Sequence, residues 1–155
     1  MTTIKTLIKE CNFGYIANYV KDLLPEYDGT PAIPEIHHFN RYISTEDILK
    51  EFDKLGYRAG TLSELLAYQK ANPEDENWIV ALGTQFSLGG DLQSPYLSSS
   101  GGGRGLNAGS VSDDWSVHFR FLFVRKPLDI SNSASALEQQ IINVINAGYS
   151  VSKNI

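Results

Sequence analysis

Residues 115–125 most constrain the fold of this chain, because two kinds of side chain alternate along them. Aromatic residues and Val117 occupy every second position from Trp115 to Phe123, and mostly polar residues lie between them. A period of two in aromatic and β-branched residues is typical of a β-strand. We therefore expect a strand over 115–125, near the centre of a sheet.

Residues 98–114, just before this strand, have the opposite composition and are rich in Ser and Gly. Such a segment buries too little apolar surface to offset the entropy of ordering, so its composition alone indicates a disordered loop or linker. A polar segment between ordered strands is also a common place for a binding surface. Both interpretations are open at the level of composition.

The first half of the chain carries helix patterns. Apolar residues spaced i, i+3, i+4 predict helices over 1–10 and 13–24, and prolines then predict a loop over 25–36. Capping-box patterns that begin at Ser44 and Thr61 predict two further helices.

The second half is richer in strand patterns. Residues 37–42 have weak strand character, residues 78–82 form a continuous apolar run typical of a buried strand, and Trp78 is expected in the core. Residues 83–94 indicate turns, and residues 136–147 form an amphipathic pattern that predicts a last helix. Helices, then short strands, then a helix indicate an α+β fold with an antiparallel sheet flanked by helices.

Length and charge exclude several classes of protein. A chain of 155 residues is long enough for one packed domain, and its net charge of -5 argues against a nucleic-acid binder, which needs a basic stripe. Cys11 is the only cysteine, so neither an intrachain disulfide nor a cysteine-based zinc site is expected. The apolar runs are too short for a membrane span, and residues 1–10 lack the apolar stretch of a secretory signal.

Histidines and acids suggest catalysis or metal binding only weakly. His37 and His38 are adjacent, so their side chains diverge, and no third ligand lies at a useful spacing. His118 could form a triad with Asp113 or Asp114 and one of the many nearby serines, but no Gly-x-Ser-x-Gly elbow is present. Asp113 and Asp114 could bind calcium, although a turn before the strand explains them as well. We expect no catalytic residue, no metal and no cofactor.

The run Gly103-x-Gly105-x-x-Ala108 formally matches a dinucleotide-binding fingerprint. Such a fingerprint requires a buried strand before it, a helix after it and an acidic residue about 20 positions further on. None of these is predicted here, so we do not assign a nucleotide site.

Four runs in combination resemble the variable proteins of diversity-generating retroelements, which occur in phages, viruses, bacteria and archaea and have a C-type-lectin-like fold. The runs are GYRAGTLSELL at 56–66, IVALG at 79–83, GRGL at 103–106 and WSVHFRFLFVR at 115–125. The resemblance implies a single domain over 1–155, composed of a helical extension over 1–35, a lectin-like core over 36–126 and a C-terminal helix within 127–155.

In that family an adenine-mutated copy replaces one gene segment, so asparagine codons change while the scaffold stays fixed. The resemblance places the variable segment at about 93–118. The implied scaffold residues are Gly83, Pro95, Leu97, Gly103, Arg104, Leu106, Trp115 and residues 120–125. The implied variable, ligand-binding positions are Tyr96, Ser98, Ser100, Gly105, Asn107, Ala108, Ser110, Ser112, Ser116 and His118.

The function that this resemblance implies is non-enzymatic binding of a protein or another cell-surface ligand, such as a glycan, and not of nucleic acid. It is compatible with a monomer and with delivery to a virion or a cell surface. Two alternatives come from other classes. One is a structural or accessory subunit of a virion or mobile element, and the other is an enzyme of the sulfatase-modifying type, against which the single Cys11 argues.

Overall fold

A computed structural model describes residues 3–21, 31–101 and 103–126, without the side chain of Tyr19. All of these residues except Lys126 belong to one compact unit, residues 1–125. The helix predicted over 136–147 lies outside the described residues, as does the part of the predicted proline-rich loop before Pro31.

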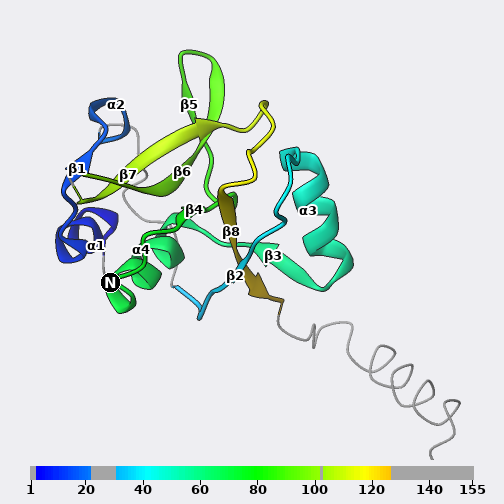
Figure 1. The fold of residues 1–155 in the computed structure, drawn as a ribbon, viewed down its shortest axis with the longest axis horizontal. Coiled ribbons are helices and arrows are strands. Elements are labelled where there is room, and N and C mark those ends of the chain that lie inside the picture. Colours follow the sequence, from blue (N-terminus) through cyan, green and yellow to red (C-terminus); the bar gives the residue numbers. More distant parts are fainter. Residues whose placement is uncertain (1–2, 22–30, 102, 127–155) are drawn as a thin grey trace, which may run out of the picture. The chain divides into compact units, whose positions relative to one another are not determined.

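The described strands form one mixed sheet in the order β1-β7-β6-β4-β8-β2, with β3 also paired to β8 and β5 to β6 (Figure 1). The α+β class is confirmed, but the expectation of an antiparallel sheet is wrong, because β1 pairs with β7 and β4 with β8 in parallel. The long path between β4 and β8, which includes a hairpin, allows that parallel pairing. The strands are β1 Tyr15–Ile16, β2 Glu35–His37, β3 Tyr57–Ala59, β4 Trp78–Val80, β5 Phe86–Leu88, β6 Asp91–Ser100, β7 Gly103–Ser110 and β8 Phe119–Arg125.

Three helices of eight to ten residues and one helical turn are described, and capping fixes where the longer ones begin. The hydroxyl groups of Thr3, Ser44 and Thr61 each accept a backbone N–H three residues further on. This confirms the two helix starts predicted from the capping-box patterns at Ser44 and Thr61. The elements are α1 Ile4–Cys11, α2 Asn18–Lys21, α3 Thr45–Lys54 and α4 Leu62–Ala71.

The helix predicted over 13–24 is wrong for its first residues. Asn12 ends α1 in the left-handed conformation with φ of 57°, and Tyr15–Ile16 form β1 against Gly105 and Leu106 of β7. The backbone N–H groups of Gly14 and Ala17 also donate to β7 carbonyls. Pairing with the sheet therefore outweighs the helical spacing of the apolar side chains, as tertiary context often does.

The strand predicted over 115–125 begins only at Phe119. Trp115 instead forms an isolated bridge with Ile43, and its indole N–H donates to the Thr45 hydroxyl at 2.8 Å. The expected central position of the strand is confirmed, because β8 pairs with β2, β3 and β4.

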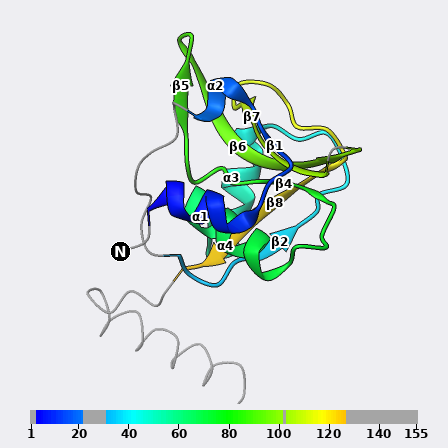
Figure 2. The same cartoon turned by 90° about the vertical axis from the view of Figure 1, so that its left-hand side faces the viewer.

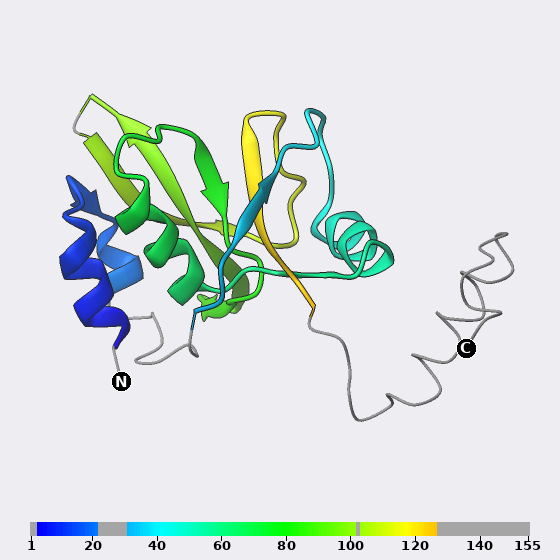
Figure 3. The same cartoon turned by 90° about the horizontal axis from the view of Figure 1, so that it is seen from below.

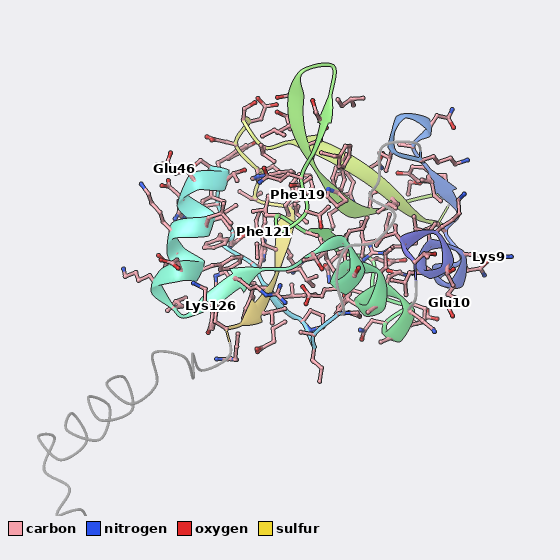
Figure 4. All side chains as sticks on the ribbon, turned by 180° about the vertical axis from the view of Figure 1, so that it is seen from behind. Lys9, Glu10, Glu46, Phe119, Phe121 and Lys126 are labelled. Atoms are coloured by element: carbon pink, nitrogen blue, oxygen red, sulfur yellow. The ribbon has the colours of Figure 1, made fainter. Side chains whose placement is uncertain are left out.

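Two apolar clusters lie on opposite faces of the sheet. Leu122 of β8 belongs to the cluster that includes residues of α1 and α4, whereas Phe121 belongs to the cluster that includes Ile48 and Phe52 of α3. Figure 2 shows α1 beside α4, and Figure 3 shows the strands between these helices and α3. In Figure 4, Phe119 and Phe121 lie between α3 and α4. The alternation along β8 thus supplies both layers of the core.

Candidate functional site

The serine- and glycine-rich segment is a hairpin of two long strands. β6 and β7 pair in an antiparallel register that runs from Gln93 opposite Ser110 to Ser100 opposite Gly103. Gly103 has a φ of 100°, a conformation that side chains other than that of glycine rarely adopt. The disordered-loop interpretation is therefore wrong for the described residues of 98–110.

One face of this hairpin is anchored in the core. Leu97 and Leu106 lie directly opposite each other, and both are fully buried in the cluster that also holds Leu65 and Leu66 of α4. Ala108 lies on the same face of β7 and is 8% exposed. Burial of these side chains supplies the free energy that the small residues around them cannot.

Arg104 ties the hairpin to two other parts of the fold. Its Nε donates to Gln69 Oε1 of α4 at 2.8 Å, and its Nη1 donates to the backbone oxygen of Asn77 at 2.6 Å and to Ser99 Oγ at 2.9 Å. Its Nη2 is buried and has no hydrogen-bond partner among the described residues. Burial lowers the pKa of the Arg104 guanidinium. The arrangement is that of a structural anchor.

The opposite face of the hairpin carries a polar cluster under Tyr15. The Tyr15 hydroxyl lies 2.7 Å from Ser98 Oγ, and Asn107 Nδ2 donates to the Tyr15 hydroxyl at 2.7 Å and to Ser98 Oγ at 3.0 Å. A Cβ atom added to Gly105 would overlap the Tyr15 ring. Tyr15 comes from β1, so the N-terminal segment covers part of the face that the resemblance assigns to the ligand.

Aromatic rings continue this face toward β4 and β8. The Tyr96 ring stacks on Trp78 with centroids 6.0 Å apart and meets Phe119 edge-on at 5.1 Å. The Trp115 ring lies against Gly109, where an added Cβ would approach it to 2.9 Å. The face is therefore polar near Tyr15 and aromatic near Trp78.

The structure brings together only some of the ten predicted positions. Tyr96, Ser98, Gly105 and Asn107 share one face of the hairpin, but Ala108 lies on the core face because alternate strand residues point to opposite sides. Ser98 is 3% exposed and Gly105 is also buried, since Tyr15 covers both. Exposure at a ligand face is thus wrong for these three positions, Ser98, Gly105 and Ala108.

The other predicted positions are reachable but spread out. Ser100 is exposed at the turn of the hairpin, whereas Ser112 is exposed beyond its far end, where its hydroxyl bonds Ser110 and Asp91. Ser116 is half-buried and His118 is exposed in the segment that leads into β8. That these positions vary stays a prediction.

A hollow beside Trp78 is lined by residues from several parts of the chain. It has a volume of about 580 Å³ and is lined by His38, Asn40, Glu76, Asn77, Trp78, Val117, His118 and Arg120. We call it the Trp78 pocket. The expectation that Trp78 lies in the core is wrong, because this residue is 38% exposed, whereas Phe121 and Phe123 are buried in the core.

Hydrogen bonds hold the walls of the Trp78 pocket. The backbone oxygen of Asn77 accepts from Arg104, its side-chain oxygen accepts from Arg120, and its N–H donates to Asp75 Oδ1 at 2.8 Å. On the other side, His38 Nε2 lies 2.6 Å from the backbone oxygen of Val117. Residues from distant parts of the chain therefore meet in a fixed arrangement.

Asp75 and Tyr68 form a second polar contact behind this wall, in which the Tyr68 hydroxyl donates to the Asp75 carboxylate. Burial would raise the pKa of Asp75, but hydrogen bonds from Tyr68 and Asn77 outweigh burial and lower it. Burial and the same bond raise the pKa of Tyr68 to about 12. Neither group is poised to exchange a proton near neutral pH.

Metal and nucleophile chemistry find little support. The described residues contain no group of three His, Cys, Asp or Glu side chains placed to hold a metal ion. Cys11 is buried, its thiol donates to the Leu66 carbonyl, and burial and nearby Glu10 raise its pKa to about 11. A thiol with such a pKa is a poor nucleophile at neutral pH. None of the helices in the described ranges has the length and apolar character needed to cross a membrane.

Sequence patterns missed Tyr15, Asn77 and Trp78 as parts of this surface. Tyr15 lies in a segment whose apolar spacing predicts a helix, and Trp78 begins an apolar run that predicts a buried strand. The neighbouring polar run from Glu74 to Asn77 was the one signal that β4 starts at the surface. No family model matches this chain, and no match is found among curated proteins or solved structures.

Proposed function

We propose that this chain is a non-enzymatic, ligand-binding protein with a C-type-lectin-like fold, and that a retroelement diversifies its surface. The observation that carries the proposal is the β6–β7 hairpin. Buried Leu97 and Leu106 fix it from one side, while small polar residues occupy positions that core packing does not need. The resemblance in four sequence runs supplies the link to retroelements.

The hairpin supports a division between fixed and changeable positions. Leu97, Leu106 and Trp115, which the resemblance assigns to the scaffold, are all at most 4% exposed. Substitutions at exposed positions usually change stability by less than about 0.5 kcal/mol, whereas truncation of a buried leucine costs about 2–5 kcal/mol. A surface with this contrast can change its binding specificity and stay folded.

Burial narrows the set of proposed variable positions. We leave out Ser98, Gly105 and Ala108, because larger side chains there would collide with Tyr15 or the core. The narrowed set is Tyr96, Ser100, Asn107, Ser110, Ser112, Ser116 and His118. The proposed ligand is a protein or another cell-surface molecule.

Sequencing of the genomic locus tests the diversification. We expect a reverse transcriptase gene near this gene, and a near-identical copy of the segment 93–118 that differs mainly at adenines. These differences should fall in codons of the narrowed set and spare those of Leu97 and Leu106. A locus without such a repeat and such a gene would remove the retroelement from the proposal.

Ligand binding is tested with the protein itself. A library randomised at the narrowed set would be displayed and selected against several unrelated purified proteins. We expect folded binders to different targets. The matched control randomises seven exposed positions on and just after α3 and should yield fewer binders; these are Glu46, Asp47, Leu49, Lys50, Asp53, Lys54 and Leu55. Equal yields from both libraries would show that the hairpin face has no special capacity for binding.

A further inference from the structure

We propose that the Trp78 pocket is a constant binding subsite for a neutral saccharide. The inference goes beyond the function proposed above, because His118 is the only lining residue among the predicted variable positions. The other seven lining residues would therefore be shared by every diversified form of the protein, whereas changes at His118, or at Tyr96 against the Trp78 ring, would alter the affinity. It does not depend on a retroelement, so the locus test can fail without affecting it.

Part of the pocket lining is a partly exposed aromatic ring that neighbouring rings hold in position. Trp78 is 38% exposed, although the next two residues of β4, Ile79 and Val80, are fully buried. Its ring stacks on Tyr96 at 6.0 Å and meets Phe119 edge-on at 5.5 Å. A flat apolar surface of this kind suits the C–H face of a pyranose ring, whose hydroxyl groups then point to the rim.

The lining also supplies three exposed polar side chains, those of Asn40, Glu76 and His118, which we call the rim groups. Asn40, Glu76 and His118 are exposed, and their side chains make no hydrogen bond or ion pair with other residues in the described ranges. Amide, carboxylate and imidazole groups together offer both donors and acceptors. A sugar hydroxyl is itself donor and acceptor, so neighbouring hydroxyls can bond several of these groups at once.

The pocket is largely formed before a ligand arrives. Asn77 is held by Arg104, Arg120 and Asp75, and His38 is held against the Val117 carbonyl. A wall that is already ordered loses less conformational entropy on binding. The volume of about 580 Å³ lies within the range of small-molecule sites, roughly 300–1,000 Å³.

Charge favours a neutral ligand over a phosphorylated one. Glu76 and Arg120 contribute one charge of each sign to the lining, and the Arg120 guanidinium uses one of its five N–H groups to hold Asn77. Phosphate groups are bound by cations with free donors, often in bidentate geometry. A nucleotide or sugar phosphate would also approach the Glu76 carboxylate. The geometry therefore points to an uncharged saccharide.

Nuclear magnetic resonance can test this with the full chain labelled with nitrogen-15. Glucose, galactose, mannose, N-acetylglucosamine and their common disaccharides would be titrated with a chelator present, alongside glucose 6-phosphate and AMP. We expect at least one neutral sugar to shift the indole N–H signal of Trp78. The Trp115 indole donates to Thr45 in the core, so its signal should stay in place and report an intact fold.

Two substitutions locate the binding. Trp78→Ala should weaken the sugar affinity by at least about tenfold, which corresponds to about 1.4 kcal/mol. Tyr42→Ala removes another exposed aromatic ring, 67% exposed and outside the pocket, and should leave the affinity unchanged. Asn40→Ala and Glu76→Gln alter exposed rim groups and should weaken binding even if Trp78→Ala fails to fold.

Three results would overturn the proposal. One is the absence of any Trp78 shift with every neutral sugar at dissociation constants up to about 10 mM, near the weak end of measurable affinity. Another is tighter binding of AMP or glucose 6-phosphate than of any neutral sugar. The third is unchanged sugar affinity in folded Trp78→Ala or in both rim variants.

Discussion

β8 and the β6–β7 hairpin belong to the same sheet and are separated only by β4, yet they are ordered in different ways. Phe121–Val124 of β8 are all buried, so side chains from both faces of one strand fill two clusters. The hairpin buries Leu97 and Leu106 on one face and carries Tyr96 together with small or polar residues on the other. A strand can thus be specified by its own side chains or by the parts that pack around it.

The hairpin depends on a few contacts for its order. Leu97 and Leu106 reach the core, Arg104 bonds to α4, and Tyr15 covers the other face. Its own polar residues contribute little apolar burial. The comparison therefore predicts large effects where an anchor is removed and small effects elsewhere in the same strands.

The largest effects should follow from truncation of the anchors. Phe121→Ala in β8 should lower the free energy of unfolding by about 3–5 kcal/mol, and Leu106→Ala in β7 by about 2–5 kcal/mol, since both side chains are at most 1% exposed. Chemical denaturation measures both. A cost below about 1 kcal/mol for Leu106→Ala, outside the range for buried leucines, would show that the hairpin does not depend on its core face.

A smaller but still large effect should come from one added methyl group. Gly105→Ala should cost about 1–3 kcal/mol, because the new Cβ would displace the Tyr15 ring from Ser98 and Asn107. When Tyr15→Ala is already present, Gly105→Ala should cost less stability than it does in the native chain, because the ring that the new Cβ would displace is absent. Additive costs in thermal or chemical denaturation would contradict this, and Gly101→Ala, which meets open space, is the control.

The free energy of unfolding should also depend on pH, through the contact between Glu64 of α4 and Arg58 of β3, the neighbour of β8. Burial alone would raise the pKa of Glu64, but hydrogen bonds from Arg58 of β3, Thr61 and Ala32 outweigh burial and lower it. The unfolded chain therefore takes up this proton at a higher pH, so the stabilisation is complete above the ordinary glutamate pKa. It is lost as the pH falls through the lowered value.

Glu64→Gln should accordingly lower stability by about 1–2 kcal/mol at neutral pH, a modest cost because Arg58 is partly exposed and can be hydrated. The variant and the native chain should converge as the pH falls. Glu46→Gln breaks an exposed pair with Lys50 and serves as the control, with little change at any pH. A gap that stays constant with pH would mean that ionisation of Glu64 is not what stabilises the fold.

The smallest effects are expected at exposed hairpin and loop positions. Single changes of Ser100, Ser112 or His118 to alanine or aspartate should alter the free energy of unfolding by less than about 0.5 kcal/mol. The same substitutions at Ser98, which is 3% exposed, should cost more. If denaturation experiments give the same change in the free energy of unfolding for substitutions at Ser98 and at Ser100, burial under Tyr15 does not determine which hairpin positions can change.

Helix starts and the central strand could be predicted because their causes are local. A hydroxyl three residues before a backbone N–H caps α3 and α4, and the run of phenylalanines makes β8 a strand wherever it packs. The α+β class followed from the order of these elements. The start of this strand at Phe119 could not be predicted in the same way, because Trp115 is held by Ile43 and Thr45, which are distant in sequence.

The candidate site was less predictable, because it is made of contacts between segments. Composition marked 98–112 as a special region, but strand alternation and the Tyr15 ring decide which of its residues are exposed. The Trp78 pocket joins residues near positions 38, 77 and 118. No local pattern brings these three segments together.

The two residues of β1 have a consequence for solubility. The outer edge of β7 would otherwise offer its carbonyl groups at Arg104 and Leu106 to other molecules, but Gly14 and Ala17 donate to them. Unpaired strand edges recruit strands from neighbouring chains and lead to aggregation. Loss of the first seventeen residues would free both carbonyl groups, and we expect the protein then to associate with its own copies along this edge.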